Sequence, residues 1–289
     1  MIDLSQRAQE NMKQILDRVS DIPPLPHIVI EALNIIKDPK STAVNLANVI
    51  SQDQALTARV LRLSNAAYFG YARRIKTVTE AIVILGFGVV ENILYAAALH
   101  AHLSKEVEGY ELQKGALWEH SMSVAIGAKT LAKLIKYPKP EEPFTAGILH
   151  DIGKTIIGKF VQKEFQTINE LVEEGKSFQE AEIAVLGFDH AYLGGKVAEK
   201  WNLPPMLIEA IAHHHSPTDA KDFVDIVCIV HIADAVALMS GQGVGADGLL
   251  YRLEPKAMEV LNIKEEHLEN IYTQVVQAFI DHRQLLEID

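Results

Sequence analysis

Apolar residues recur along almost the whole chain with the three- and four-residue spacing of amphipathic helices, and the two-residue alternation typical of strands is nearly absent. Side chains able to cap helix N-termini stand at Ser41 and Thr42, at Asp53 and at Thr77, so short helices are predicted after each of these positions. Longer helices are predicted over residues 4–20, 28–37, 112–136, 141–157, 160–175, 178–186, 190–201, 204–215, 220–240 and 264–287. The predicted fold class is all-α.

One polar stretch, residues 104–111, interrupts this pattern most clearly. We therefore predict a two-lobed helical bundle, with an N-terminal lobe over residues 1–108 and a second helical lobe over residues 109–289. The glycine-rich segment 241–248 is predicted to be a flexible loop, because it lacks the Lys-Ser/Thr pair of a phosphate-binding loop.

Composition narrows the classes of function. The chain has 289 residues and a formal net charge of −11, which disfavours nucleic-acid binding by the chain as a whole. One basic segment, residues 59–76, interleaves arginines with aromatic residues. A solvated loop packed by its aromatics is the favoured interpretation in an acidic chain, but the segment is still our first choice for a partner surface. A single cysteine, Cys228, rules out a disulfide within the chain and a Cys-based metal site. The sequence shows neither a signal peptide nor a membrane-spanning segment, so a soluble cytoplasmic protein is expected.

The clearest candidate for chemistry is His150-Asp151, which stands in an apolar run. Lys154 follows His150 by four residues and should share its face of the predicted helix. A nitrogen ligand, an oxygen ligand and a cation on one buried surface suit a metal ion that holds an anion such as phosphate. The alternative is a core histidine beside a solvated Asp–Lys pair.

Further imidazole and carboxylate groups occupy four other predicted helices. These groups are His120, His190, the triplet His213-His214-His215 and Asp234. Asp234 lies on an apolar helix, where burial is costly unless the carboxylate is paired or ligating. Imidazole and carboxylate without thiolate suit iron, manganese, nickel or zinc, and the set is large enough for two ions. Spacing alone leaves open which two histidines of the triplet bind.

The order of these residues resembles the HD phosphohydrolase superfamily, and the lysine after His150-Asp151 together with the paired histidine is similar to the HD-GYP phosphodiesterases. The N-terminal half resembles the HDOD domain of bacterial signalling proteins. Its matching motifs are IPPLP at 22–26, LANVISQDQALTARVLRLSNAAYF at 46–69 and TEAIVILG at 79–86. The resemblance spans about residues 15–240.

This resemblance implies residue roles. Asp151 would bridge two divalent metal ions, with iron the first choice. His120, His150 and Asp234 would complete one metal site, and His190, His214 and His215 the other. Lys154 would hold a phosphate or carboxylate oxygen beside the metals, where a phosphate or nucleotide is the expected ligand. His231 lies one helical turn before Asp234, and this spacing makes it a candidate to support a ligand from behind.

Two functions remain open. The HDOD resemblance implies a metal-binding signal-transduction module that acts on protein partners in trans. The unbroken ligand set supports the alternative, a dinuclear phosphohydrolase or phosphodiesterase acting on a nucleotide or cyclic dinucleotide, with Asp151 and Lys154 as catalytic residues. The chain departs from HD-GYP enzymes at 216–218, which read Ser-Pro-Thr, and at Ala116, where those enzymes can place a glutamate for a third metal.

Overall fold

The computed structural model describes residues 4–19, 24–66, 74–248, 251 and 253–281. Throughout these residues the regular structure is helical, and the only extended pairing is an isolated bridge between Val107 and Leu112, which confirms the all-α prediction. The α-helices are α1 (Leu4–Val19), α2 (His27–Lys37), α3 (Ala43–Ile50), α4 (Gln54–Ser64), α5 (Val78–Leu85), α6 (Phe87–Leu103), α7 (Ala116–Leu134), α8 (Glu141–Leu149), α9 (Lys154–Glu173), α10 (Phe178–Leu186), α11 (His190–Lys200), α12 (Pro205–His213), α13 (Val224–Met239), α14 (Pro255–Val260) and α15 (Glu265–Asp281). Short 3₁₀ turns are η2 (Glu108–Tyr110), η3 (Pro217–Asp219) and η4 (Ala246–Gly248).

Three of the predicted helix caps are present, and at the start of α3 the cap is Thr42 and not Ser41. The side chains of Thr42, Asp53 and Thr77 each accept a hydrogen bond from the backbone N–H three residues later, which satisfies one of the free donors at a helix start. The Glu80 carboxylate accepts from the backbone N–H of Lys76 at 2.8 Å, one residue before the cap.

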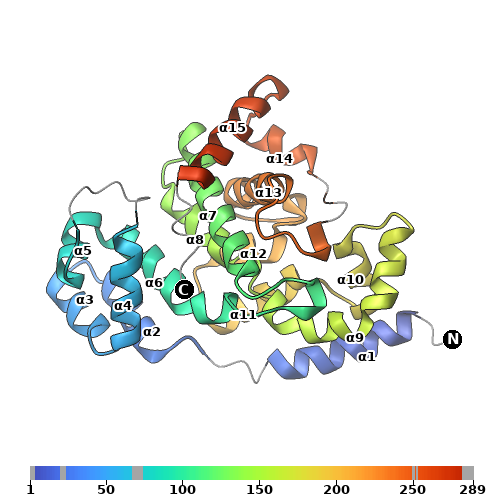
Figure 1. Ribbon diagram of the computed structural model, residues 1–289, viewed down its shortest axis with the longest axis horizontal. Helices are drawn as coiled ribbons and strands as arrows, with labels where there is room; N and C mark the ends of the chain where they lie inside the picture. Colours follow the sequence, from blue (N-terminus) through green and yellow to red (C-terminus); the bar gives the residue numbers. More distant parts are fainter. Residues whose placement is uncertain (1–3, 20–23, 67–73, 249–250, 252, 282–289) are drawn as a thin grey trace.

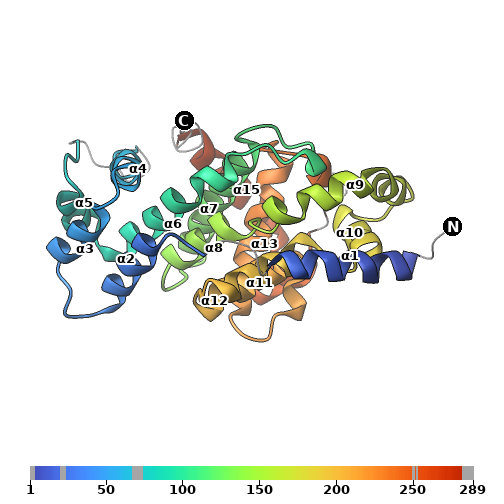
Figure 2. The same cartoon turned by 90° about the horizontal axis from the view of Figure 1, so that it is seen from below.

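Helix α7 runs through the middle of the molecule and packs against α8, α13 and α15, while α2 to α5 gather at one end (Figure 1). Helix α1 lies away from α2 and packs along α10, where the Asn11 side chain donates to the Val185 carbonyl at 3.1 Å (Figure 2). Helix α1, which belongs to the predicted N-terminal lobe, therefore contacts α10 of the predicted second lobe. The division at residue 108 stays a prediction.

The predicted helix over 141–157 is wrong in one respect. Helix α8 ends at Leu149, residues 150–153 form tight turns, and α9 begins at Lys154 and continues to Glu173. Consequently His150 and Lys154 do not share a helix face. A Cβ at Gly153 would lie 2.0 Å from the carbonyl oxygen of His190, so the turn lies directly against the first residue of α11.

Helix α14 was not predicted. In the basic segment, the Arg59 guanidinium donates to the Ala97 carbonyl at 2.8 Å, and Arg74 and Lys76 are exposed, whereas residues 67–73 lie outside the described residues. Its role as a partner surface stays a prediction. No helix in the described part of the chain combines the length and the apolar character that crossing a membrane requires.

Candidate metal centre

The fold brings the predicted ligand residues together in the interior. They come from α7 (His120), the turn after α8 (His150 and Asp151), the first residue of α11 (His190), the end of α12 (His214 and His215) and α13 (Asp234). All are buried except His215, which is half-buried.

Asp151 lies at the centre of this cluster. Its Oδ2 lies 3.3 Å from Nε2 of His150 and 3.6 Å from Nε2 of His120. Its Oδ1 lies 3.3 Å from Nε2 of His190 and 3.7 Å from Nε2 of His214. The two carboxylate oxygens therefore face two different groups of imidazoles, which is the arrangement that a bridging ligand needs.

Asp234 and His215 complete the two groups of imidazoles and carboxylates around Asp151. Asp234 Oδ1 lies 3.0 Å from Nε2 of His120, and His215 Nε2 lies 2.8 Å from Nε2 of His190. His213 is half-buried and lines a different cavity, beside Met12 on α1. The structure thus places His214 and His215, and not His213, with the other candidate ligands.

Backbone carbonyl groups orient three of the imidazoles. Nδ1 of His150 and Nδ1 of His214 each donate to a carbonyl oxygen at 2.8 Å, and Nδ1 of His120 donates to the carbonyl of Gln242 at 3.0 Å. A carbonyl oxygen can only accept, so the proton resides on Nδ1 and Nε2 points into the cluster. This is the usual way in which a protein fixes the tautomer of a histidine that binds a metal.

Several cluster atoms have no hydrogen-bond partner despite being buried. These atoms are His150 Nε2, Asp151 Oδ1, His214 Nε2 and Asp234 Oδ1. Leaving a buried polar atom unpaired costs about 1–3 kcal/mol. Ligand atoms within 4.8 Å of one another occur in three overlapping triplets drawn from this cluster, including His120-His150-Asp151 and His190-His214-His215. The residues present therefore fit divalent metal ions.

The electrostatics favour the metal-binding form of three members of the cluster, Asp151, His214 and His215. Burial alone would raise the pKa of Asp151, but His150 and Lys154 outweigh it and hold that pKa well below its usual range. Burial, reinforced by neighbouring imidazoles, lowers the pKa of His214 and of His215 well below the usual histidine value. A carboxylate and two neutral imidazoles are the forms that coordinate a metal. At His120 and His190 burial lowers the pKa, but neighbouring carboxylates outweigh it; they raise the pKa of His120, and that of His190 to about 10, so a metal must displace a proton there.

Comparison with known proteins places this architecture in a family. Residues 22–217 match the family model described as "HDOD domain". The chain belongs to the HDOD family. This confirms the resemblance of the N-terminal motifs.

Proteins similar to this HDOD chain include two solved structures and one curated protein. A protein named "Putative phosphohydrolase" from Shewanella amazonensis SB2B is 27% identical with a TM-score of 0.74, over 94% of this chain and 97% of that one. An HDOD domain protein from Geobacter sulfurreducens is 25% identical with a TM-score of 0.68, over 96% and 99% of the two chains. A protein of Treponema pallidum (strain Nichols) is 25% identical over 236 residues, which are 81% of this chain and 45% of that protein. The chain thus spans less than half the length of this curated relative.

Sequence reasoning missed one buried carboxylate of the HDOD site. Glu182 on α10 accepts a hydrogen bond of 2.8 Å from Nδ1 of His190, and the Tyr110 hydroxyl donates to its other oxygen. Its side chain has no exposed surface. The available signal was a glutamate in the apolar stretch of α10, eight residues before His190.

The loop 241–248 also belongs to the site. A Cβ at Gly243, whose φ is +59°, would lie 2.3 Å from the carbonyl oxygen of Ala116, so the loop packs on the first turn of α7. Gln242 orients His120 through its carbonyl, and Asp247 forms an ion pair with Lys154. The interpretation of this segment as merely a flexible loop missed these contacts.

Lys154 lies between two carboxylates. Its Nζ lies 2.5 Å from Asp151 Oδ2 and also pairs with Asp247. Burial opposes the charge, but the two carboxylates outweigh it and raise the pKa of Lys154, which stays an ammonium. A cavity of about 250 Å³ opens beside it and reaches the cluster at His190, His215 and Asp234.

His231 supports the site from behind, as expected. Its Nδ1 donates to the carbonyl of His214 at 2.7 Å, and its Nε2 accepts from the backbone N–H of Glu254 at 2.8 Å. The ring therefore fixes the backbone that carries two candidate ligands.

Proposed function

We propose that this HDOD protein is a signal-transduction module that binds two divalent metal ions, iron first and manganese, nickel or zinc as alternatives, and acts through protein partners. One site consists of His120, His150, Asp151 and Asp234. The other consists of Asp151, His190, His214 and His215. The observation that carries the proposal is the set of unpaired buried nitrogen and oxygen atoms that face one another across Asp151.

Metal analysis of the purified protein tests this assignment. We expect about two ions per chain in the wild type and fewer in His214→Ala. His213→Ala is the matched control, because His213 is the neighbouring residue but lines another cavity. If His213→Ala and His214→Ala lose metal equally, or if the wild type holds none, the assignment is wrong.

A second candidate function is a metal-dependent phosphohydrolase. It is favoured by the cavity beside the cluster, which Lys154 lines next to Asp151. When bound, the two ions would supply Lewis-acid activation of water and of the phosphoryl group. Lys154 would hold a phosphoryl oxygen. The Asp247 carboxylate would compete with that oxygen, because it already forms an ion pair with the Lys154 ammonium.

An assay of substrate hydrolysis distinguishes the regulatory function from the enzymatic one. The metal-loaded protein is assayed against p-nitrophenyl phosphate, nucleotides and cyclic dinucleotides. If the protein with both ions bound hydrolyses none of these substrates, the enzymatic function is ruled out and the regulatory function is retained. If hydrolysis occurs, Lys154→Met should abolish it while metal content stays intact, and Lys163→Met, an exposed position on α9, should not.

A further inference from the structure

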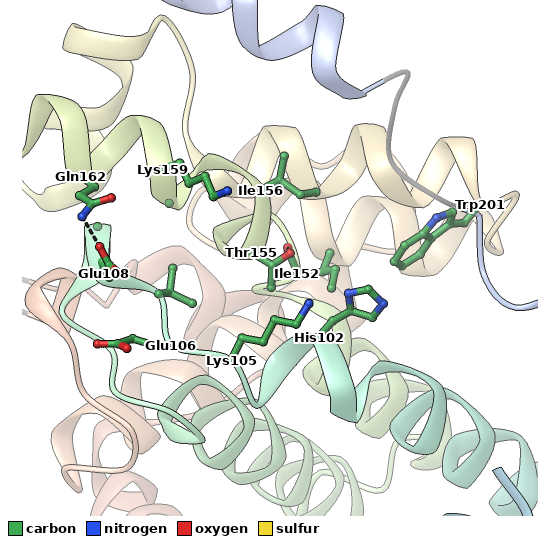
Figure 3. Close-up of a pocket in the computed structure, with 13 residues that line it drawn as sticks. His102, Lys105, Glu106, Glu108, Ile152, Thr155, Ile156, Lys159, Gln162 and Trp201 are labelled. Atoms are coloured by element: carbon green, nitrogen blue, oxygen red, sulfur yellow. Dashed lines mark hydrogen bonds between the residues drawn. The ribbon is translucent and has the colours of Figure 1, made fainter. Parts of the chain in front are cut away.

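A second, larger cavity lies on another side of the turn formed by residues 150–153. It measures about 530 Å³, opens to the surface, and is lined by the C-terminal end of α6, the segment 104–109, α9 and Trp201 (Figure 3). None of its lining residues lines the cavity beside the metal cluster. Its volume falls within the range of about 300–1,000 Å³ that small-molecule pockets occupy.

The walls of this cavity are held by close packing. A Cβ at Gly109 would lie 2.1 Å from the carbonyl oxygen of Gly158, so the backbone of η2 lies directly on α9. The Gln162 side chain donates to the Glu108 carboxylate next to this contact. These contacts are made by regular elements, so the cavity is a preformed feature of the fold.

Two lysines extend into the cavity from facing walls. Lys105 follows α6 and Lys159 lies on α9, and both side chains reach toward its middle (Figure 3). Neither forms an ion pair with another described residue. Partial burial and the charge of Lys105 lower the pKa of His102, so this neighbouring imidazole is neutral at pH 7 and offers one N–H donor. The part of the cavity between Lys105, Lys159 and His102 is therefore suited to an anion.

An apolar surface adjoins the lysines. Ile152 and Ile156 line the cavity between them and Trp201, whose half-buried indole stands at the far end (Figure 3). The acidic residues Glu106 and Glu108 lie at the opposite end from Trp201. An indole binds flat rings, such as a nucleobase, by stacking.

We propose that this cavity binds a small phosphorylated aromatic molecule of the size of a nucleoside monophosphate. The ring would pack against Trp201 and the isoleucines, and the phosphate would lie between Lys105 and Lys159. Lysine ammonium groups bind phosphate as point charges, so two of them on facing walls give the site both affinity and orientation. The site requires no metal ion and is independent of the function proposed above.

Titration with AMP that carries a fluorescent N-methylanthraniloyl group on its ribose tests the proposal. We expect saturable binding to the full chain in the presence of EDTA. Lys159→Ala and Trp201→Ala should each weaken it by about fivefold or more, because each removes a contact worth about 1 kcal/mol or more. Lys163→Ala is the matched control, since it removes an exposed lysine one turn further along α9, outside the cavity. The equally labelled adenosine, which lacks the phosphate, should bind at least about fivefold more weakly.

A variant that fills the cavity without changing its charge gives a second criterion. Thr155→Trp should abolish binding while the circular dichroism spectrum stays that of the wild type. The proposal is overturned if no saturable binding occurs up to about 1 mM probe, or if Lys159→Ala and Trp201→Ala bind as the wild type does. Binding that disappears with EDTA would assign the probe to the metal centre and would also overturn it.

Discussion

The Glu182 carboxylate and the His190 imidazole form a buried hydrogen-bonded pair, with Oε2 of Glu182 2.8 Å from Nδ1 of His190. The same oxygen lies 3.3 Å from the backbone nitrogen of His190, so the carboxylate fixes both the ring and the first residue of α11. His190 Nε2 is thereby turned toward Asp151, at 3.3 Å from Oδ1. A carboxylate behind a metal-binding imidazole sets its orientation and makes it a better ligand.

Removing this carboxylate should weaken metal binding without touching a ligand. For Glu182→Ala we expect a loss of about 10- to 100-fold in metal affinity, and for Glu182→Gln, which keeps an acceptor oxygen, a smaller loss. Competition with a chromophoric chelator measures the affinity. Glu170→Gln, an exposed carboxylate on α9, is the control. Unchanged affinity in Glu182→Ala would contradict a role of the Glu182 carboxylate in supporting a metal-binding His190.

The candidate ligands could be predicted because each is recognisable from its residue type and its immediate sequence neighbours. Imidazoles and carboxylates in apolar helical runs are conspicuous, and Asp234 on α13 is an example whose burial demanded an explanation. The roles of Glu182 and Asp247 were not predictable, because each depends on an element that folds back from another part of the chain. Neither residue type nor spacing indicates that Asp247 pairs with Lys154.

The break between α8 and α9 was hidden for a different reason. His150 and Gly153 both have helical backbone torsions, with φ/ψ of −51°/−39° and −61°/−31°. No proline marks the interruption, so the apolar pattern continues through it. What distinguishes the turn is the close approach of Gly153 to His190, a tertiary contact that no local pattern reports.

This close approach yields a prediction on stability. Gly153→Ala places a methyl group 2.0 Å from the His190 carbonyl oxygen and 2.8 Å from the Gly194 nitrogen. We expect the free energy of unfolding to fall by about 1–3 kcal/mol or more, although alanine usually stabilises a helical position by about 1 kcal/mol. Gly88→Ala in α6 is the control, because no atom lies within 4 Å of its added Cβ, and it should be neutral or stabilising. Urea unfolding measures both, and equal stability of the two variants would contradict the packing of the turn on α11.

The reactivity of the Cys228 thiol tests the packing of α13. Its side chain is 1% exposed, and burial raises the pKa of its thiol to about 11. Because the thiolate is the reactive form, we expect the native protein to react with Ellman's reagent at pH 8 far more slowly than the protein unfolded in guanidinium. Equal rates in the two states would place α13 elsewhere than in the core.

The central claim is that two metal ions lie on either side of Asp151. Crystals of the metal-loaded protein, measured with X-rays on both sides of the absorption edge of the metal found by elemental analysis, test it most directly. We predict two anomalous peaks, one among His120, His150, Asp151 and Asp234, and one among Asp151, His190, His214 and His215. No peak at this cluster in crystals of protein that retains two ions, or peaks bound by other residues, would contradict the account.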